Sequence, residues 1–449
     1  MSKLREQSRA LRPGVWPAAL RSAWPAALGA VLAFLAQHYA THFVSDFQAK
    51  VLLDVGINIV LAVSLTIVNG FTGQFSIGHG AFMAVGGYSA AAIVYYGSML
   101  TYGDANVHGG LISMMLTGRE AAWVTPADGL FAAALLIGGL AAGVCGYLVG
   151  LPSLRLKGDY LAIVTLGFGE IVRVLFQQTT DVLYTPEDVR ATSWYLLPTK
   201  VGGALGFSGL PFYTSLFWVY LFASIMLIVA YRLKYSTYGR AFLSIREDEI
   251  AAEAMGVNTT RYKVWAFVIA AFFAGIGGGL FAHTVGVQLN PQELGFQKSF
   301  DIIIMVVLGG LGSISGAAIA AVIVTILPEV LRDPTPFLRL WPILLVVAAV
   351  GWAAWGALRH RVRPLAGALL GIASIATVLL ALAFVAERLI AGGKNPGDYR
   401  MIVFALALIV MMIARPQGLF GVRELWERAL WRNVDRRRGF PVRRVGRGT

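Results

Sequence analysis

The polar stretch 235–258 contains the residues of a short charged helix with a defined start and end. Ser244 followed by Glu247 is a capping-box pattern, in which each side chain accepts a hydrogen bond from a backbone N–H at the helix start. Acidic residues complement the N-terminal turn, and Gly256 favours a C-terminal stop. The stretch therefore predicts a short water-exposed helix with a surface that another protein can approach closely. A solvated loop helix without a partner explains the same residues.

A second polar stretch, 70–82, interrupts an apolar region with four glycines and several polar side chains. Non-helical backbone at membrane depth is tolerated only where it is buried in protein or lines a cavity. In transporters such breaks direct helix N-termini at substrate carboxylates, but small residues and Ser or Thr also serve close helix packing. Both interpretations stay open, and the candidate pathway residues are Thr72, Gly73, Gln74, Ser76 and His79. By itself, His79 is interpreted as a hydrogen-bonded packing residue.

Glu170 and Arg173 lie three residues apart in the apolar stretch 160–178, so a helix places them on one face. Ionisable residues inside a span are candidates for function. Their mutual attraction is a sufficient structural explanation, and we interpret them as a structural ion pair. Asp54 and Asp301 each begin a span, where a carboxylate complements the helix N-terminus. We assign these two aspartates no transport role.

Several motifs of catalytic proteins are absent from the sequence. No G-x-x-x-x-G-K-[ST] motif occurs, so we do not expect this chain to hydrolyse ATP itself. No H-E-x-x-H motif and no paired set of Cys and His occurs, which argues against a metal site. The single cysteine, Cys145, cannot form an internal disulfide. We therefore expect a protein without catalysis, with no metal or cofactor bound by this chain.

The elements that position these residues are membrane helices. Of the 449 residues, 57% are hydrophobic and 14% are charged, whereas soluble domains carry about 25% charged residues. A spanning helix needs roughly 20 mostly apolar residues, and candidate spans lie at 24–44, 51–69, 76–97, 128–150, 160–178, 211–231, 264–285, 341–358, 364–390 and 397–414. The apolar stretch 300–331 is broken by glycines, and it predicts two short spans or a re-entrant hairpin. The predicted fold is all-α, a polytopic transmembrane bundle of about ten spans plus this glycine-broken hairpin.

The positions of Lys and Arg predict the orientation, because these residues accumulate in cytoplasmic loops. They gather before the first span, in 151–159, in 232–263, at 359–363 and in the basic tail 422–449. The loops 98–127 and 179–210 are poor in Lys and Arg and fall on the other side. Both termini are therefore predicted to be cytoplasmic, and the first apolar run is interpreted as a retained helix. The net charge of +13 reflects these loops, and we expect no nucleic-acid partner.

Five stretches occur in an order that resembles one family of transporters. They are GFTGQFSIGHGAF (70–82), LRLKGDYLAIVTLGFGEIVR (154–173), IREDEIAAEAMGVN (245–258), VLGGLGSISG (307–316) and ARPQGLFG (414–421). Together they resemble the permease subunits of ABC importers for branched-chain amino acids. The resemblance covers roughly residues 50–330 and 397–421.

The resemblance implies that 235–258 is a coupling loop, which docks on an ATPase and transmits its closure to the membrane helices. The residues assigned to coupling are Arg246, Glu247, Asp248, Glu249, Ala251, Ala252, Glu253 and Gly256. It also implies a complex in the bacterial inner membrane with a second permease subunit, two ATP-binding subunits that hold ATP and magnesium, and a periplasmic substrate-binding protein. The implied substrates are leucine, isoleucine and valine, and urea or short amides are an alternative because their permeases share much of this pattern.

The chain is predicted to be a single membrane domain over 1–449 with two departures from the family pattern. An inserted helix pair is predicted at 341–390, with a Trp-rich start that suits the membrane interface. The segment 181–201 is longer and less regular than the family pattern. A secondary ion-coupled transporter is a further alternative, and it requires intramembrane ionisable residues, for which Glu170 and Arg173 are thin support. No charge set for a membrane enzyme and no charge ring for a channel is apparent.

Overall fold

The computed structural model describes residues 27–35, 37–38, 45–113, 123–153, 159–284 and 288–332, together with Ile409, Gly418 and Glu424. The chain divides into two compact units, 1–322 with 417–449 and 323–416. Over the described residues the regular elements are helices, and Phe207 and Leu289 form an isolated antiparallel bridge. The predicted all-α class is confirmed.

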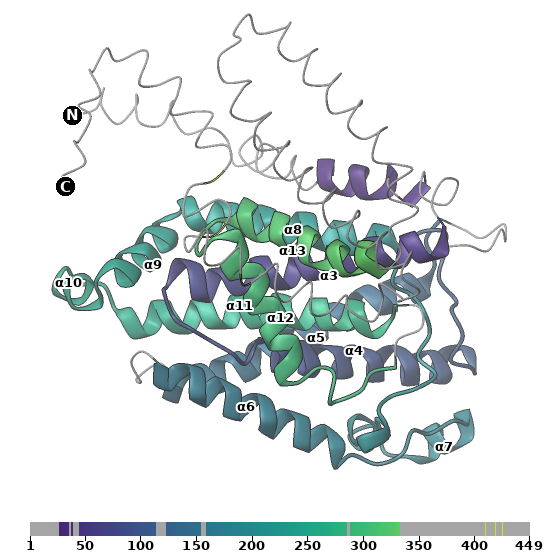
Figure 1. Ribbon diagram of the computed structural model, residues 1–449. Helices are drawn as coiled ribbons and strands as arrows, with labels where there is room; N and C mark the ends of the chain where they lie inside the picture. The colour runs from purple at the N-terminus through teal and green to yellow at the C-terminus, as the bar shows by residue number, and fades with distance from the viewer. Residues whose placement is uncertain are drawn as a thin grey trace, which may run out of the picture. The chain divides into compact units, whose positions relative to one another are not determined.

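Figure 1 shows the helices in their spatial arrangement. They are α3 (Asp46–Leu65), the π-helix η1 (Thr66–Phe71), α4 (His79–Tyr102), α5 (Pro126–Ser153), α6 (Asp159–Gln177), α7 (Pro186–Ala191), the 3₁₀ helices η2 (Leu197–Thr199) and η3 (Gly203–Leu205), α8 (Leu216–Tyr235), α9 (Thr237–Glu247), α10 (Glu249–Ala254), α11 (Thr259–Ala282), α12 (Phe296–Gly309) and α13 (Ile314–Arg332).

Five of these helical stretches are long and apolar enough to cross a membrane. They are Asp46–Phe71, Pro126–Leu151, Tyr160–Gln177, Leu216–Tyr235 and Thr259–Ala282, and each coincides with a predicted span. The predicted span 76–97 corresponds to α4, which is long enough at 24 residues but less apolar. The predicted elements 341–390 and 397–414 apart from Ile409, and the tail 422–449 apart from Glu424, lie outside the described residues. The count of about ten spans therefore stays a prediction.

Helices α3 and α11 form the centre of the first unit. In the most apolar stretch of each, 78% and 72% of the residues are buried, against 22% in α6. Helix α11 packs against α3, α4 and α5. Glycines allow the backbones to meet, since a Cβ atom at Gly86 would lie 2.1 Å from the Cα atom of Gly275. Small residues allow membrane helices to approach this closely, and the resulting van der Waals contacts hold the helices together in place of a hydrophobic driving force.

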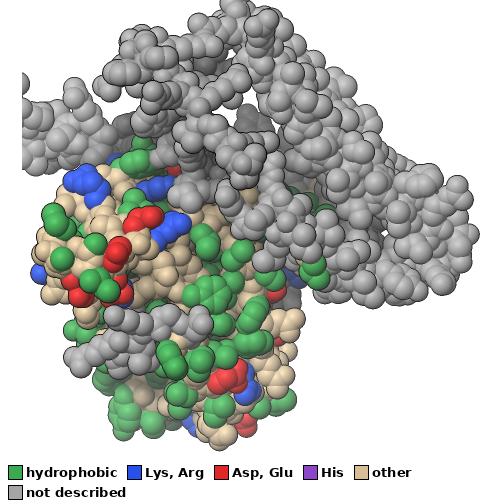
Figure 2. Space-filling view, turned by 60° about the vertical axis from the view of Figure 1, so that its left-hand side comes forward, with side chains coloured by type: hydrophobic (Ala, Val, Ile, Leu, Met, Phe, Trp, Pro, Cys, Tyr) green, Lys and Arg blue, Asp and Glu red, His purple; other side chains and the backbone are tan. Residues whose placement is uncertain are grey.

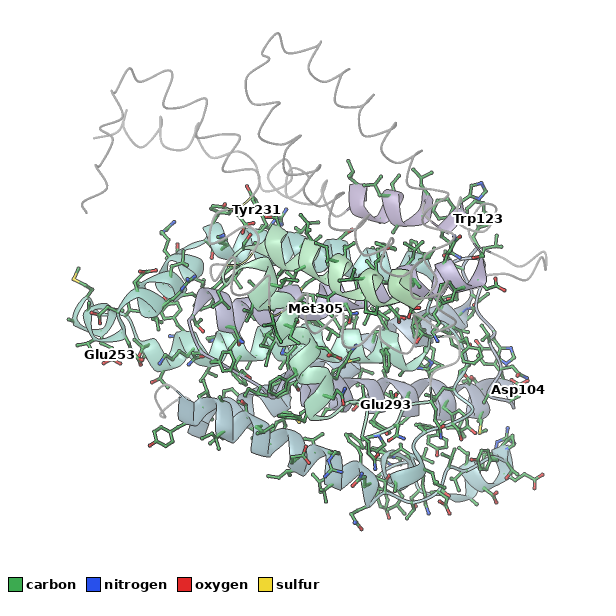
Figure 3. The ribbon with its side chains drawn as sticks, in the orientation of Figure 1. Asp104, Trp123, Tyr231, Glu253, Glu293 and Met305 are labelled. Carbon is green, nitrogen blue, oxygen red and sulfur yellow. The ribbon has the colours of Figure 1, made fainter. Side chains whose placement is uncertain are left out.

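The antiparallel helices α8 and α11 define two ends of this unit. At one end the Thr214 N–H donates to the carbonyl of His283 over 3.2 Å. At the other end, called here the arm end, α9 and α10 connect α8 to α11. Figure 3 shows Glu253 of α10 at the arm end and Asp104, which follows α4, at the opposite end. The chain before α12 belongs to the opposite end, because Leu289 pairs with Phe207.

The glycine-broken stretch 300–331 forms two helices joined by a turn at 310–313. Gly310 and Gly312 have φ values of +106° and +92°, which only glycine adopts readily. The turn lies at the arm end, since Lys234 Nζ at the end of α8 donates to the carbonyl of Gly312 over 2.9 Å. Helix α12 has 14 residues and is about 21 Å long, so the non-helical chain before it covers the remaining depth.

Candidate functional site

The segment between α8 and α11 is an arm of two short helices, α9 and α10, called here the α9–α10 arm. The Ser236 hydroxyl caps α9 by accepting a hydrogen bond from the Gly239 N–H over 3.1 Å. Asp248 ends α9 with an extended backbone and caps α10, because its Oδ1 accepts from the N–H groups of Ile250 and Ala251 at 2.9 and 3.0 Å. Gly256, with φ +84°, follows the end of α10. This left-handed position is the helix stop expected of glycine.

The capping box predicted at Ser244 and Glu247 is wrong. Ser244 lies inside α9, and its hydroxyl donates to the carbonyl of Ala241 over 2.9 Å. The reason is that the chain is already helical from Thr237, so free N–H groups that need a cap occur at the starts of α9 and α10 and not at Ser244. The short carboxylate of Asp248 then performs the capping that the sequence pattern assigned to Ser244.

The tip of the α9–α10 arm exposes large apolar side chains among charged ones. Ile250 is 72% exposed and Met255 is 84% exposed, and Glu247, Asp248 and Glu253 are exposed around them. Figure 2 brings this side of the molecule forward and shows acidic, basic and hydrophobic side chains close together on its surface. Exposed apolar surface rimmed by polar residues marks a candidate contact surface for another protein.

The arm is braced against the first turn of α11. Glu249 forms an ion pair of 2.6 Å with Lys263, and the Thr259 hydroxyl donates to Glu253 over 2.6 Å. Ala252 is buried beneath α10. Two of the eight residues assigned to coupling from the sequence therefore point inward. Ala252 is buried, and Arg246 Nη1 donates to the carbonyl of Gly70 over 2.8 Å.

The second polar stretch, 70–82, is a true interruption between two helices. The π-helical turn η1 ends at Phe71, residues 72–78 are non-helical, and α4 starts at His79. π-Helical turns are rare and are frequently found at functional sites. Hydrogen bonds satisfy the free backbone here, since the Ser76 N–H donates to Asn69 Oδ1 over 3.2 Å and the Ile77 N–H donates to the Thr165 hydroxyl over 3.0 Å.

The candidate pathway side chains are packed rather than open in this structure. Thr72, Gln74, Ser76 and His79 are buried, and His79 Nε2 lies 2.9 Å from the Ser64 hydroxyl. The Thr72 hydroxyl donates back to the carbonyl of Val68 over 2.8 Å. This arrangement is a closed segment held by its own hydrogen bonds.

Helices α4 and α12, which both follow non-helical chain, start next to each other. The N–H of Gly80, in the first turn of α4, donates to the Ser299 hydroxyl in the first turn of α12 over 2.9 Å. A Cβ atom at Gly80 would lie 2.8 Å from the carbonyl oxygen of Leu294. The N-termini of α4 and α12 therefore meet, as the helix breaks of transporters do around a substrate site.

Glu170 and Arg173 lie on one face of α6, with Arg173 Nε 2.7 Å from Glu170 Oε2. Arg173 also donates to Gln177 over 3.1 Å. Both side chains are partly exposed. The ion pair and the bond to Gln177 give both charges a partner, so their presence in this helix needs no transported ion.

The sequence interpretation missed three polar residues around the broken segments. Asn69 is buried, and its amide nitrogen has no partner among the residues that the structure describes. Lys234 and Glu424 form a buried ion pair of 2.6 Å. Asn69 is next to the glycine-rich stretch, so the sequence could have indicated that it lies at the break. No local pattern indicates that Lys234 and Glu424 are partners.

No group of three potential metal ligands occurs within the described part of the chain.

Long apolar helices, an interrupted helix and a charged arm at one end define a polytopic helical membrane protein. The chain belongs to the family described as "Branched-chain amino acid transport system / permease component", whose model matches residues 48–350.

The chain is similar to individual permeases of this kind. The high-affinity branched-chain amino acid permease protein LivM of Salmonella typhimurium is 34% identical over 318 residues, which cover 67% of this chain and 68% of that protein. The high-affinity branched-chain amino acid transport system permease protein LivH of the same organism is 25% identical over 265 residues, which cover 59% of this chain and 78% of that protein. The guanosine permease NupQ of Bacillus subtilis is 22% identical over 148 residues, covering 31% and 46%. No solved structure matches the chain.

Proposed function

We propose that this chain is a pore-forming permease subunit of an ATP-driven ABC importer that moves branched-chain amino acids across the bacterial inner membrane. The observation that carries the proposal is the α9–α10 arm, with its exposed apolar tip and its braced base. A self-sufficient carrier has no use for a capped arm that exposes Ile250 and Met255 to water. ATP and magnesium belong to two partner ATP-binding subunits, and this chain binds neither.

The proposed assembly also contains a second permease subunit and a periplasmic substrate-binding protein, as the family resemblance implies. Both termini and the arm lie on the cytoplasmic side, because Lys and Arg gather in the segments there. The substrate assignment rests on the names of the relatives, which specify branched-chain amino acid transport. Urea or a short amide is the alternative cargo, and competition of leucine uptake by excess urea or acetamide distinguishes the two.

Changing the arm tip is expected to release the ATP-binding subunits. The double variant Ile250→Asp with Met255→Asp places two carboxylates on the proposed contact surface without removing a buried side chain. We expect co-purification of the ATP-binding subunits and uptake of leucine to fall by about tenfold or more, since central apolar contacts carry about 2 kcal/mol each or more. Leu205→Asp is the matched control, because Leu205 is 77% exposed on η3, away from the arm. Retention of the ATP-binding subunits by the double variant would contradict the proposal.

The secondary-transporter alternative makes a different prediction at α6. If Glu170 carried a coupling ion, Glu170→Gln would abolish uptake. As one half of a partly exposed i,i+3 pair it contributes about 0.2–0.5 kcal/mol, so we expect leucine uptake by Glu170→Gln to stay within about twofold of wild type. Loss of uptake with normal membrane insertion would favour an ion-coupled carrier.

A further inference from the structure

The side chain of Arg246 extends from the α9–α10 arm into a small space bordered by Gly70, Gly73 and Gly312, called here the glycine socket. Its Nη1 donates to the carbonyl of Gly70 over 2.8 Å and lies 3.5 Å from the carbonyl oxygen of Leu311. A Cβ atom at Gly312 would lie 2.6 Å from Nη1, and one at Gly73 would lie 3.0 Å from Arg246 Cγ. The Arg246 side chain therefore occupies space that a larger residue would fill, with its stem against Gly73 and its guanidinium against Gly312.

The socket joins the two interruptions of the helical bundle. Gly70 lies at the end of η1, where the candidate pathway segment starts, and Gly312 lies in the turn 310–313 between α12 and α13. The two backbones touch, since a Cβ atom at Gly70 would lie 2.6 Å from the Gly312 nitrogen. The carbonyl of Gly70 lies near the end of η1, where carbonyl groups lack their helical partner, and Arg246 supplies its donor. The carbonyl of Leu311, in the turn, lies within reach of the same nitrogen.

Arginine suits this position better than lysine. Its planar guanidinium holds five N–H donors in fixed directions, and Nη1, which carries two of them, lies within reach of both carbonyls. Lys234 holds the same turn from another side, through Gly312 and Glu424, and it belongs to α8 rather than to the arm. Arg246 is thus the polar link that runs from the arm itself to both interrupted segments.

We infer that Arg246 is a positioning residue, which transmits movement of the α9–α10 arm to the turns at Gly70 and 310–313 and does not form part of the ATPase contact. The inference rests on the proposed function and deepens it. When a partner displaces the arm tip, the ion pair of Glu249 with Lys263 moves α11, and Arg246 moves the two turns at the cytoplasmic end of the pathway. Without Arg246 the partner still docks and hydrolyses ATP, but the turns no longer follow the arm.

The test compares Arg246→Gln, Arg246→Lys and the control Arg240→Gln in the full complex, reconstituted with its binding protein in proteoliposomes. Arg240 lies on the same helix, is exposed, and donates within its own helix to Thr237. The measurements are retention of the ATP-binding subunits, ATP hydrolysis and leucine uptake. We expect Arg246→Gln to keep the ATP-binding subunits and to raise the number of ATP molecules hydrolysed per leucine by about tenfold. Arg246→Lys is expected to lie between this variant and wild type, and Arg240→Gln to match wild type.

The ratio of ATP to leucine separates this role from a structural one, because a folding defect lowers hydrolysis and uptake together and leaves their ratio unchanged. An unchanged ratio in Arg246→Gln overturns the inference, and so does loss of the ATP-binding subunits in that variant, which would place Arg246 in the docking contact. A wild-type complex that shows no ATP-dependent uptake would instead remove the proposed function before any variant is compared.

Discussion

Replacing Glu424 by alanine is expected to destabilise the folded protein by about 3–5 kcal/mol, the usual cost of leaving a buried ion without its partner. The Glu424 side chain is fully buried and the Lys234 side chain is 8% exposed, with 2.6 Å between Nζ and Oε1. The same carboxylate accepts from the N–H groups of Ile314 and Ser315 at 2.9 and 3.0 Å and so caps α13. The alanine variant therefore loses an ion pair and a helix cap together.

The measurement is the midpoint of thermal unfolding in detergent for three variants. Glu424→Ala and Lys234→Met each leave one buried charge unpaired, whereas the double variant Lys234→Met with Glu424→Met leaves none. We expect the double variant to be more stable than Glu424→Ala, because removing both charges of a buried pair is less harmful than removing one. Additive losses in the double variant would show that the pair is not coupled.

Acidification tests the same carboxylate. Burial alone would raise the pKa of Glu424, but hydrogen bonds from Lys234, Ser315 and two backbone N–H groups outweigh it and hold the pKa below its ordinary value. A lowered folded-state pKa stabilises the protein above the ordinary value of about 4.3. The stability gap between wild type and Glu424→Ala is therefore expected to be constant near neutral pH. It should shrink as the pH falls below that value toward the folded-state pKa.

The second large effect is expected at Gly278, where α11 meets α4. A Cβ atom at this position would lie 1.9 Å from the carbonyl oxygen of Met83 and 2.9 Å from the Gly87 nitrogen. Alanine is ordinarily favoured over glycine in a helix by about 1 kcal/mol. Overpacking costs about 1–3 kcal/mol and occasionally more, and a contact of 1.9 Å with backbone requires the two helices to separate, so packing decides the sign. We expect Gly278→Ala to lose most of its monodisperse protein in size-exclusion chromatography.

Gly167→Ala is the matched control for this substitution. Gly167 lies in the apolar helix α6, and a Cβ atom there meets no atom within 4 Å. We expect this variant to elute and unfold as wild type or to be slightly more stable. Equal behaviour of the two alanine variants would mean that α4 and α11 can separate at little cost, contrary to the close packing seen here.

Local chemistry explains what could be predicted of the candidate site. Glu170 and Arg173 are three residues apart, so their pairing follows from helix geometry alone. The breaks at 70–82 and 307–316 follow from glycines in apolar stretches, whose backbone adopts positive φ at Gly73, Gly310 and Gly312. The capping of α10 was assigned to Ser244 instead of Asp248, because the sequence does not reveal where α9 ends.

The sequence by itself predicted an all-α membrane protein, since apolar length and the placement of charge depend only on neighbouring residues, and the resemblance of its motifs indicated the permease family. Only the tertiary structure decided which polar groups meet at the arm end. Arg246 bonds to Gly70 across 176 positions, and Lys234 bonds to Glu424 across 190. No local period encodes such pairs, because they form only after the packing of several helices has brought their ends together.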